Sequence, residues 1–186
     1  MVPETALVIC PEGPAEDGVD RPLAGLLVGE RALLALFDAG VRRVVFAGGG
    51  ERPRSGRTGL DAVEARDAKG RAPTGAFLLL PADLVFDPRM IARPGATPPD
   101  LPIREMPAAA WRAALADPAG FLSLLGAGRA SPHRGFAVRA TDAARARAAE
   151  HALLGALIPP AGGWLARRLS RPLGLRLTAR FARAGL

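Results

Sequence analysis

The sequence has little of several residue types, and each scarcity excludes a class of protein. Of 186 residues, one is cysteine, none is tyrosine and 5% are aromatic. The single Cys10 excludes an intramolecular disulfide framework and a zinc site made of several cysteines. No apolar run reaches the roughly 18 residues that a membrane-spanning helix needs. The first residues lack the basic and apolar regions of a signal peptide. We therefore expect a globular protein of the cytosol.

The positive charge is concentrated near the C-terminal end. The net charge is +7, and residues 164–186 contain six arginines and no acid, which leaves +1 on the other 163 residues. The high isoelectric point is therefore caused by the arginines of the tail, and nucleic-acid binding by the whole protein is not indicated. Pro159-Pro160 and Gly162-Gly163 mark the clearest break in the chain. We expect one domain at 1–158 and a basic amphipathic helical tail at 159–186.

Short apolar runs alternate with helical patterns along the first part. Strands are predicted at residues 5–10, 41–47, 74–81 and 135–140. Helices are predicted at residues 24–39, 60–67, 108–116, 118–125 and, capped by Thr141 or Asp142, up to about 157. Residues 93–107 hold five prolines and are expected to be irregular or extended. The first strand, helix and strand form a βαβ unit with parallel strands. The pattern predicts a layered α/β fold with its chemistry at the carboxyl ends of the strands.

These segments resemble a known family. The opening strand, the sequence Arg21-Pro22-Leu23, an apolar helix and a second strand ending in glycine are similar to the start of nucleotidyltransferase domains that activate sugar or polyol phosphates. Residues 78–83 resemble the strand that delivers a metal-binding aspartate in that fold. Thr141-Asp142 resembles the later segment that supplies a second acidic ligand. The resemblance implies a Rossmann-like three-layer sheet with helices on both faces.

The tail resembles a second family. Residues 153–186, with Ala-Arg-Arg-Leu-Ser-Arg-Pro-Leu at 166–173, are similar to the juxtamembrane segment that opens CDP-alcohol phosphotransferase domains. Enzymes in which a cytidylyltransferase domain is fused to a CDP-alcohol phosphotransferase domain make inositol-phosphate lipids and osmolytes. The resemblance implies a downstream transmembrane domain that this chain does not contain, and a location in the cytoplasm at the inner face of the membrane.

The first loop departs from the family pattern. Residues 11–20 lack the Gly-x-Gly-x-Arg sequence that closes on phosphates, and Arg21 stands in place of the family's lysine. Four acids crowd this loop, where they would repel a triphosphate unless Mg²⁺ intervened. They are Glu12, Glu16, Asp17 and Asp20.

Each candidate residue also has a plainer interpretation. The resemblance implies that Asp83 and Asp142 hold Mg²⁺, but Asp83 could cap a turn and Asp142 a helix. Gly13 and Arg21 are the candidates for binding nucleotide phosphates, although Arg21 could be an ordinary loop arginine. Gly48-Gly49-Gly50 is typical of a flexible turn rather than of a dinucleotide site. Cys10, in a buried strand, is expected to serve packing.

The tail favours a membrane surface as partner. Its apolar residues recur every four positions, with arginines on a separate face, which suits anionic lipid. The alternative is a helix packed on its own domain. The residues expected at the membrane surface are Trp164, Arg167, Arg168, Arg171, Arg176 and Arg180.

Three functions remain open from the sequence. The first is a catalytically degenerate nucleotidyltransferase-like domain of a CDP-alcohol phosphatidyltransferase-type membrane enzyme of phospholipid or polyol-phosphate synthesis. The second is an active Mg²⁺-dependent cytidylyltransferase that takes CTP and an alcohol phosphate and releases pyrophosphate. The third is a non-enzymatic module that docks on a membrane. The first is favoured because the order of the elements is kept while the phosphate-binding chemistry is eroded.

Overall fold

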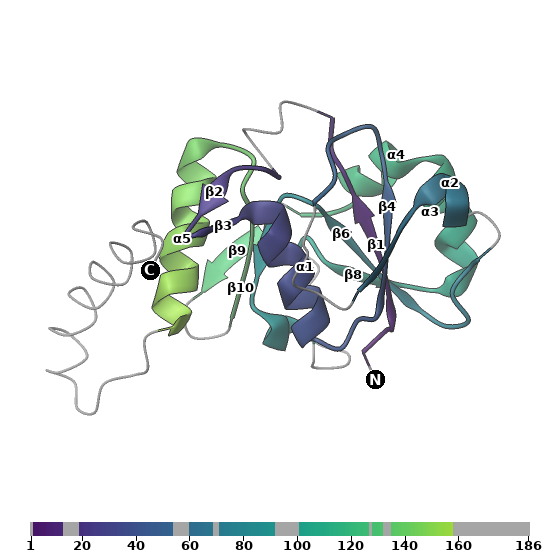
Figure 1. Cartoon of the computed structure of the whole chain (residues 1–186), viewed down its shortest axis with the longest axis horizontal. Helices are drawn as coiled ribbons and strands as arrows, with labels where there is room; N and C mark the ends of the chain where they lie inside the picture. The colour runs from purple at the N-terminus through teal and green to yellow at the C-terminus, as the bar shows by residue number, and fades with distance from the viewer. Residues whose placement is uncertain are drawn as a thin grey trace, which may run out of the picture.

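The fold is mixed α/β, built around one five-stranded sheet (Figure 1). The computed structural model describes residues 2–12, 19–53, 60–68, 71–91, 101–126, 128–131 and 135–157. The sheet has the order β5-β4-β1-β6-β8. Strands β5, β4, β1 and β6 run parallel, and β8 runs antiparallel to β6. The strands are β1 (Thr5–Ile9), β4 (Arg43–Ala47), β5 (Asp61–Glu64), β6 (Phe77–Pro81) and β8 (Arg104–Met106).

Helices pack on both faces of this sheet because its central strands alternate between two cores. In β1, Ala6 and Val8 belong to the core that includes Leu36 of helix α1 (Val28–Asp38). Leu7 belongs to the opposite core, together with Trp111 of helix α3 (Trp111–Ala116). All five residues of β1 are buried. The strands predicted at 5–10, 41–47 and 74–81 are present as β1, β4 and β6, and the parallel pairing predicted for the first two is confirmed.

A second, smaller sheet follows β6. It has the order β7-β10-β9 and is antiparallel, with β7 (Leu84–Phe86), β9 (Gly128–Ser131) and β10 (Gly135–Arg139). Helix α5 (Ala143–Leu157) covers it through Ala146, Ala149 and Ala152, which pack with Phe136 and Val138. Figure 1 shows α5 along the side of the small sheet that faces away from the large one. The strand predicted at 135–140 and the helix that follows it are confirmed.

The helix predicted from residue 24 is wrong at its start. Ala24 and Gly25 have φ values of +46° and +84° and form the turn of a hairpin, which no helix can include. The hairpin joins β2 (Pro22–Leu23) to β3 (Leu26–Leu27), and α1 begins only at Val28. Arg31 secures this turn by donating from Nε to the Leu23 carbonyl at 2.7 Å and from Nη2 to the Ala24 carbonyl. The predicted stop at Gly40 is confirmed: its φ is +100°, and its N–H bonds the Phe37 carbonyl.

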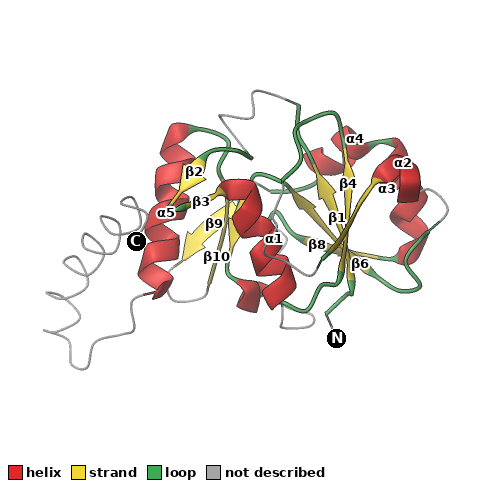
Figure 2. Cartoon of the chain, in the orientation of Figure 1, coloured by secondary structure: helices red, strands yellow, loops and turns green. Residues whose placement is uncertain are grey.

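Strand pairing decides two further expectations, of which the first is wrong. The helix predicted at 60–67 is mostly β5, which pairs with β4, and only the short α2 (Ala65–Ala68) follows it. The segment expected to be irregular or extended contains the extended strand β8, which pairs with the buried strand β6. Figure 2 shows the strands of the large sheet in yellow, with the helices in red. The helices predicted at 108–116 and 118–125 are present as a turn of 3₁₀ helix (Ala108–Ala110), then α3, and as α4 (Pro118–Ser123).

None of the helices in the described part of the chain is both long enough and apolar enough to cross a membrane.

The turn after β7 is fixed by a buried carboxylate. Asp87 is the N-cap of a 3₁₀ helix (Pro88–Met90), accepting the Arg89 backbone N–H at 3.0 Å and its guanidinium Nη2 at 2.6 Å. Burial by itself raises the pKa of the Asp87 carboxyl, but the hydrogen bonds and charge of Arg89 outweigh it and hold this pKa below its ordinary value.

This lowered pKa predicts a pH-dependent contribution to stability. A group whose folded-state pKa is depressed stabilises the fold above its unfolded pKa, about 3.9 for aspartate, and the contribution disappears as pH falls through the folded value. We expect Asp87→Asn to lower the melting temperature at neutral pH and the gap to wild type to close below about pH 3.9. Thermal melts across the acid range measure this gap. The exposed Asp38→Asn is the control for removing a carboxylate, and a gap for Asp87→Asn that persists at the acid end would contradict the assignment.

Candidate functional site

The carboxyl ends of β1, β4 and β6 meet at one edge of the large sheet. The backbone N–H of Cys10 bonds the Ala47 carbonyl at 2.7 Å, and the N–H of Ala82 bonds the Ile9 carbonyl at 2.8 Å. The segments after these three strands are therefore brought together, as expected from parallel pairing. In open α/β sheets this edge is where ligands bind.

The three glycines after β4 form a close contact with the end of β1. Gly48 has a φ of +102°, and a Cβ on it would lie 2.4 Å from the Cys10 carbonyl oxygen. A Cβ on Gly50 would lie 1.9 Å from the carbonyl oxygen of Pro11, and the Gly50 N–H already bonds the Cys10 carbonyl at 3.3 Å. Glycine is thus required here for close backbone approach. The predicted turn is present, and it packs closely on the end of β1.

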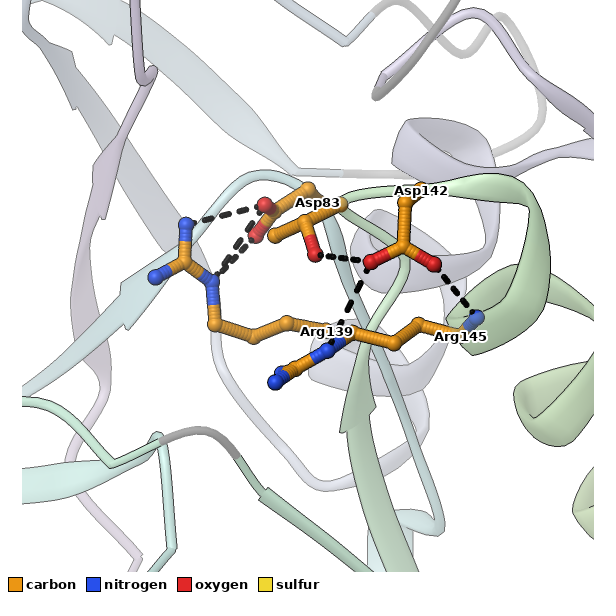
Figure 3. Close-up of polar contacts among 5 residues, drawn as sticks. Asp83, Arg139, Asp142 and Arg145 are labelled. Atoms are coloured by element: carbon orange, nitrogen blue, oxygen red, sulfur yellow. Dashed lines mark hydrogen bonds and ion pairs between the residues drawn. The ribbon is translucent and has the colours of Figure 1, made fainter.

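Asp83 lies directly after β6, as the sequence predicted, but it is paired with an arginine. Its side chain is 3% exposed and both of its oxygens accept hydrogen bonds from Arg139 at the end of β10. The distances are 3.0 Å from Nε to Oδ1, 3.3 Å from Nε to Oδ2 and 2.9 Å from Nη2 to Oδ2. Figure 3 shows the guanidinium facing the carboxylate in a two-pronged arrangement. Such bidentate pairs are among the strongest charge-assisted contacts in proteins.

The position of Arg139 is set by the backbone. Arg139 lies opposite Leu84 in the antiparallel ladder of β10 and β7. The N–H of Ala140 donates to the carbonyl of Asp83 at 2.8 Å. The two chain segments are therefore held side by side, and the guanidinium reaches the carboxylate from a neighbouring strand. Sequence analysis did not identify Arg139, although an arginine at the end of a predicted strand was a signal that could have been followed.

Asp142 caps α5. Its Oδ1 accepts the backbone N–H of Arg145 at 2.8 Å, and its Oδ2 lies 3.2 Å from the Thr141 hydroxyl and 3.6 Å from Arg145 Nε. The Arg145 backbone hydrogen bond holds the pKa of the Asp142 carboxyl below its usual range. In Figure 3 the Asp142 carboxylate faces Arg145, whereas the Asp83 carboxylate faces Arg139. The two acids are close in the fold but serve different partners.

These residues do not fit a magnesium centre. Mg²⁺ needs carboxylate oxygens that are open to it. Both oxygens of Asp83 are engaged by a guanidinium, and Asp142 is engaged by the helix that it caps. Within the described ranges, no group of three or more His, Cys, Asp or Glu side chains gathers as a metal site.

The start of α1 is also closed by the chain itself. The N–H groups of Val28 and Gly29, which open the helix, donate to the carbonyls of Arg21 and Val19 at 3.0 and 2.9 Å. Free N–H groups at a helix start are what bind phosphate. Arg21, one of the predicted phosphate-binding residues, therefore contacts this helix start through its backbone carbonyl. Gly13 and the predicted membrane-surface residues from Trp164 to Arg180 lie outside the described residues.

A cavity of about 530 Å³ lies between α1 and the carboxyl ends of β4 and β5. Its floor is apolar, with Leu33 and Phe46, and its rim is charged, with Arg52 and Glu64. Hydrogen bonds from Arg52 and then Arg66 hold the pKa of the Glu64 carboxyl below its usual range. Sequence analysis missed this feature because it expected a helix where β5 lies.

Cys10 is buried in the sheet, which agrees with a packing role. Its side chain is free and 1% exposed. Burial raises the pKa of the Cys10 thiol to about 12, against the opposing effect of the Arg52 charge. The thiol is therefore protonated at neutral pH and is a poor nucleophile.

We expect Cys10 to resist alkylation in the folded protein. Its thiolate fraction should be on the order of a thousandfold below that of an ordinary thiol, and burial blocks access further. Mass spectrometry after iodoacetamide treatment at pH 8 measures the rate, with guanidinium-unfolded protein as the reactive control and Cys10→Ser as the blank. Equal rates in the folded and unfolded protein would contradict a packing role.

Comparison with models of known protein families finds no match to this sequence, and a search of curated proteins finds no relative.

Proposed function

We propose that this chain is the nucleotidyltransferase-like head domain of a CDP-alcohol phosphatidyltransferase-type membrane enzyme, and that its own catalytic centre is degenerate. The observation that carries the proposal is the Asp83–Arg139 pair: an acid follows β6, the strand that pairs in parallel with β1, yet its oxygens are engaged by a guanidinium.

Three features support the fold that the proposal assumes. The first strand of the chain is the centre of a mostly parallel sheet, helices pack on both of its faces, and an acid follows β6. These features are shared by many Rossmann-like folds, and the narrower family rests on the resemblance of residues 21–23, 78–83 and 166–173. On this proposal the domain acts at the cytoplasmic face of the membrane by positioning or regulating the enzyme to which it belongs.

Two features of the site support degeneracy. The N–H groups that open α1 bond backbone carbonyls, and the Gly50 N–H bonds the Cys10 carbonyl. These donors are the kind that a phosphate-binding loop leaves free. Together with the engaged Asp83, they leave the described part of this edge poorly equipped for a nucleoside triphosphate and its metal.

The test is a pyrophosphate-release assay. The purified chain is incubated with CTP, Mg²⁺ and a panel of alcohol and polyol phosphates, and we expect no release above a protein-free blank. Release that depends on Mg²⁺ and disappears in Asp83→Asn would overturn the proposal in favour of an active cytidylyltransferase. Gly75→Ala, a change at a glycine with open space around it, is the matched control for protein quality.

The membrane context needs its own measurement. Fractionation and intact-mass analysis of the native gene product are expected to find it in the membrane fraction, at a mass well above 19.3 kDa. Liposome flotation of the chain with and without residues 164–186, on vesicles with and without anionic lipid, then tests whether the tail binds the surface. Equal flotation of both forms would contradict that role of the tail.

A further inference from the structure

We propose that Arg139 is a built-in cation that takes the place of a divalent metal on Asp83, so that Arg139 and a divalent metal are mutually exclusive partners of this carboxylate. The inference rests on the proposed function in one respect: both assume that Asp83 stands at the position of a metal ligand. The mutual exclusion itself follows from the contacts of the pair.

The first step of the argument is charge. The Asp83 side chain is 3% exposed, and a carboxylate removed from water to this extent needs a compensating cation or a proton. The guanidinium of Arg139, itself only 17% exposed, supplies that charge and three hydrogen bonds. A divalent ion that approached Asp83 would meet a fixed positive charge and two occupied oxygens.

The second step is rigidity. The β7–β10 ladder and the hydrogen bond from Ala140 to the Asp83 carbonyl hold the two residues together through the backbone. The backbone thus stays in place, and the guanidinium can leave Asp83 only by a change of its own side-chain rotamer, which breaks three hydrogen bonds. In wild type, therefore, the guanidinium excludes the metal and not the reverse.

The third step is what happens when the guanidinium is removed. Arg139→Gln leaves a buried carboxylate with no counter-charge. Hard divalent cations such as Mg²⁺ and Mn²⁺ bind oxygen ligands and complete their shell with water, so they offer the missing charge. The variant is thus expected to acquire a divalent-cation site on Asp83 that the wild-type protein does not have.

The experiment compares melting temperatures in EDTA and in millimolar Mn²⁺ at pH 8. We expect no Mn²⁺-dependent change for wild type. For Arg139→Gln we expect a low melting temperature in EDTA and a rise of about 5–10 °C with saturating Mn²⁺. Arg145→Gln, which removes an arginine near Asp142 instead, is the matched control and should behave like wild type. The double variant Asp83→Asn/Arg139→Gln should lose the response to Mn²⁺.

Each outcome decides the question. Folding of Arg139→Gln only when Mn²⁺ is present would support the proposal, as would the predicted rise. If Arg139→Gln does not fold in either condition, Arg139→Lys, whose single ammonium leaves one carboxylate oxygen open, must show a smaller rise that wild type lacks. Wild-type protein that binds Mn²⁺ at Asp83, or Arg139 variants that do not respond to it, would overturn the inference. Pyrophosphate release by wild type would instead contradict the proposed function, so the two failures are distinguishable.

Discussion

Asp83→Asn is expected to destabilise the protein by about 3–5 kcal/mol, because it leaves the largely buried guanidinium of Arg139 without its counter-charge. Asparagine keeps the volume of the side chain, so the loss reports the charge and the hydrogen bonds rather than a cavity. Denaturant unfolding monitored by circular dichroism gives the free energy of unfolding directly.

The controls for this prediction separate the pair from its surroundings. The double variant Asp83→Leu/Arg139→Leu removes both charges and should recover most of the loss, because a buried ion pair replaced by apolar residues is often neutral. Asp142→Asn changes a more exposed acid of the same region and should have a much smaller effect. A wild-type free energy of unfolding in Asp83→Asn would mean that the pair contributes nothing to the fold.

Gly50→Ala is expected to cost about 3 kcal/mol, the upper end of what overpacking costs. The added Cβ would stand 1.9 Å from the backbone carbonyl oxygen of Pro11. A backbone atom cannot swing aside as a flexible side chain can, so the contact between the ends of β4 and β1 must open. The hydrogen bond from Gly50 to Cys10 would be lost with it.

Gly75→Ala is the matched control for this substitution. A Cβ at Gly75 meets nothing within 4 Å, so the change should not strain the folded protein. It should be neutral, or stabilise the protein by a few tenths of a kcal/mol because alanine lowers the conformational entropy of the unfolded chain. The same denaturant unfolding compares both variants. Equal stability of the two would show that the glycine turn is not closely packed on β1.

The sequence allowed the central strands to be predicted because their signal is local. Strands β1, β4 and β6 are continuous apolar runs, as expected for strands buried on both faces. Helix α5 was predicted from its cap, Asp142, which the hydrogen bond to Arg145 confirms. These features depend on residues within one segment.

The missed elements depend on partners far along the chain. Strand β5 carries exposed and half-buried residues, so only its pairing with β4 makes it a strand. Strand β8 is three residues long and pairs only with β6 among the described strands. The hairpin before α1 needs positive φ at Ala24, which a sequence rule assigns to glycine.

The candidate site shows the same division. The place of Asp83 after its strand was predictable from the chain around it. Its partner was not, because Arg139 lies 56 positions away and reaches Asp83 only through the β7–β10 pairing. The ion pair that occupies the Asp83 carboxylate therefore depends on a long-range contact, which the sequence around Asp83 does not predict.

The central position of β1 also determines when this domain can fold. Residues 5–9 leave the ribosome before the two strands that they pair with, residues 43–47 and 77–81. The middle strand must therefore wait, unpaired on one side, until more than 70 further residues have been synthesised. Long-range parallel pairing of this kind slows folding and exposes strand edges to aggregation in the meantime. Expression at lower temperature or with chaperones should raise the soluble yield of this chain more than that of a domain whose first strand lies at a sheet edge.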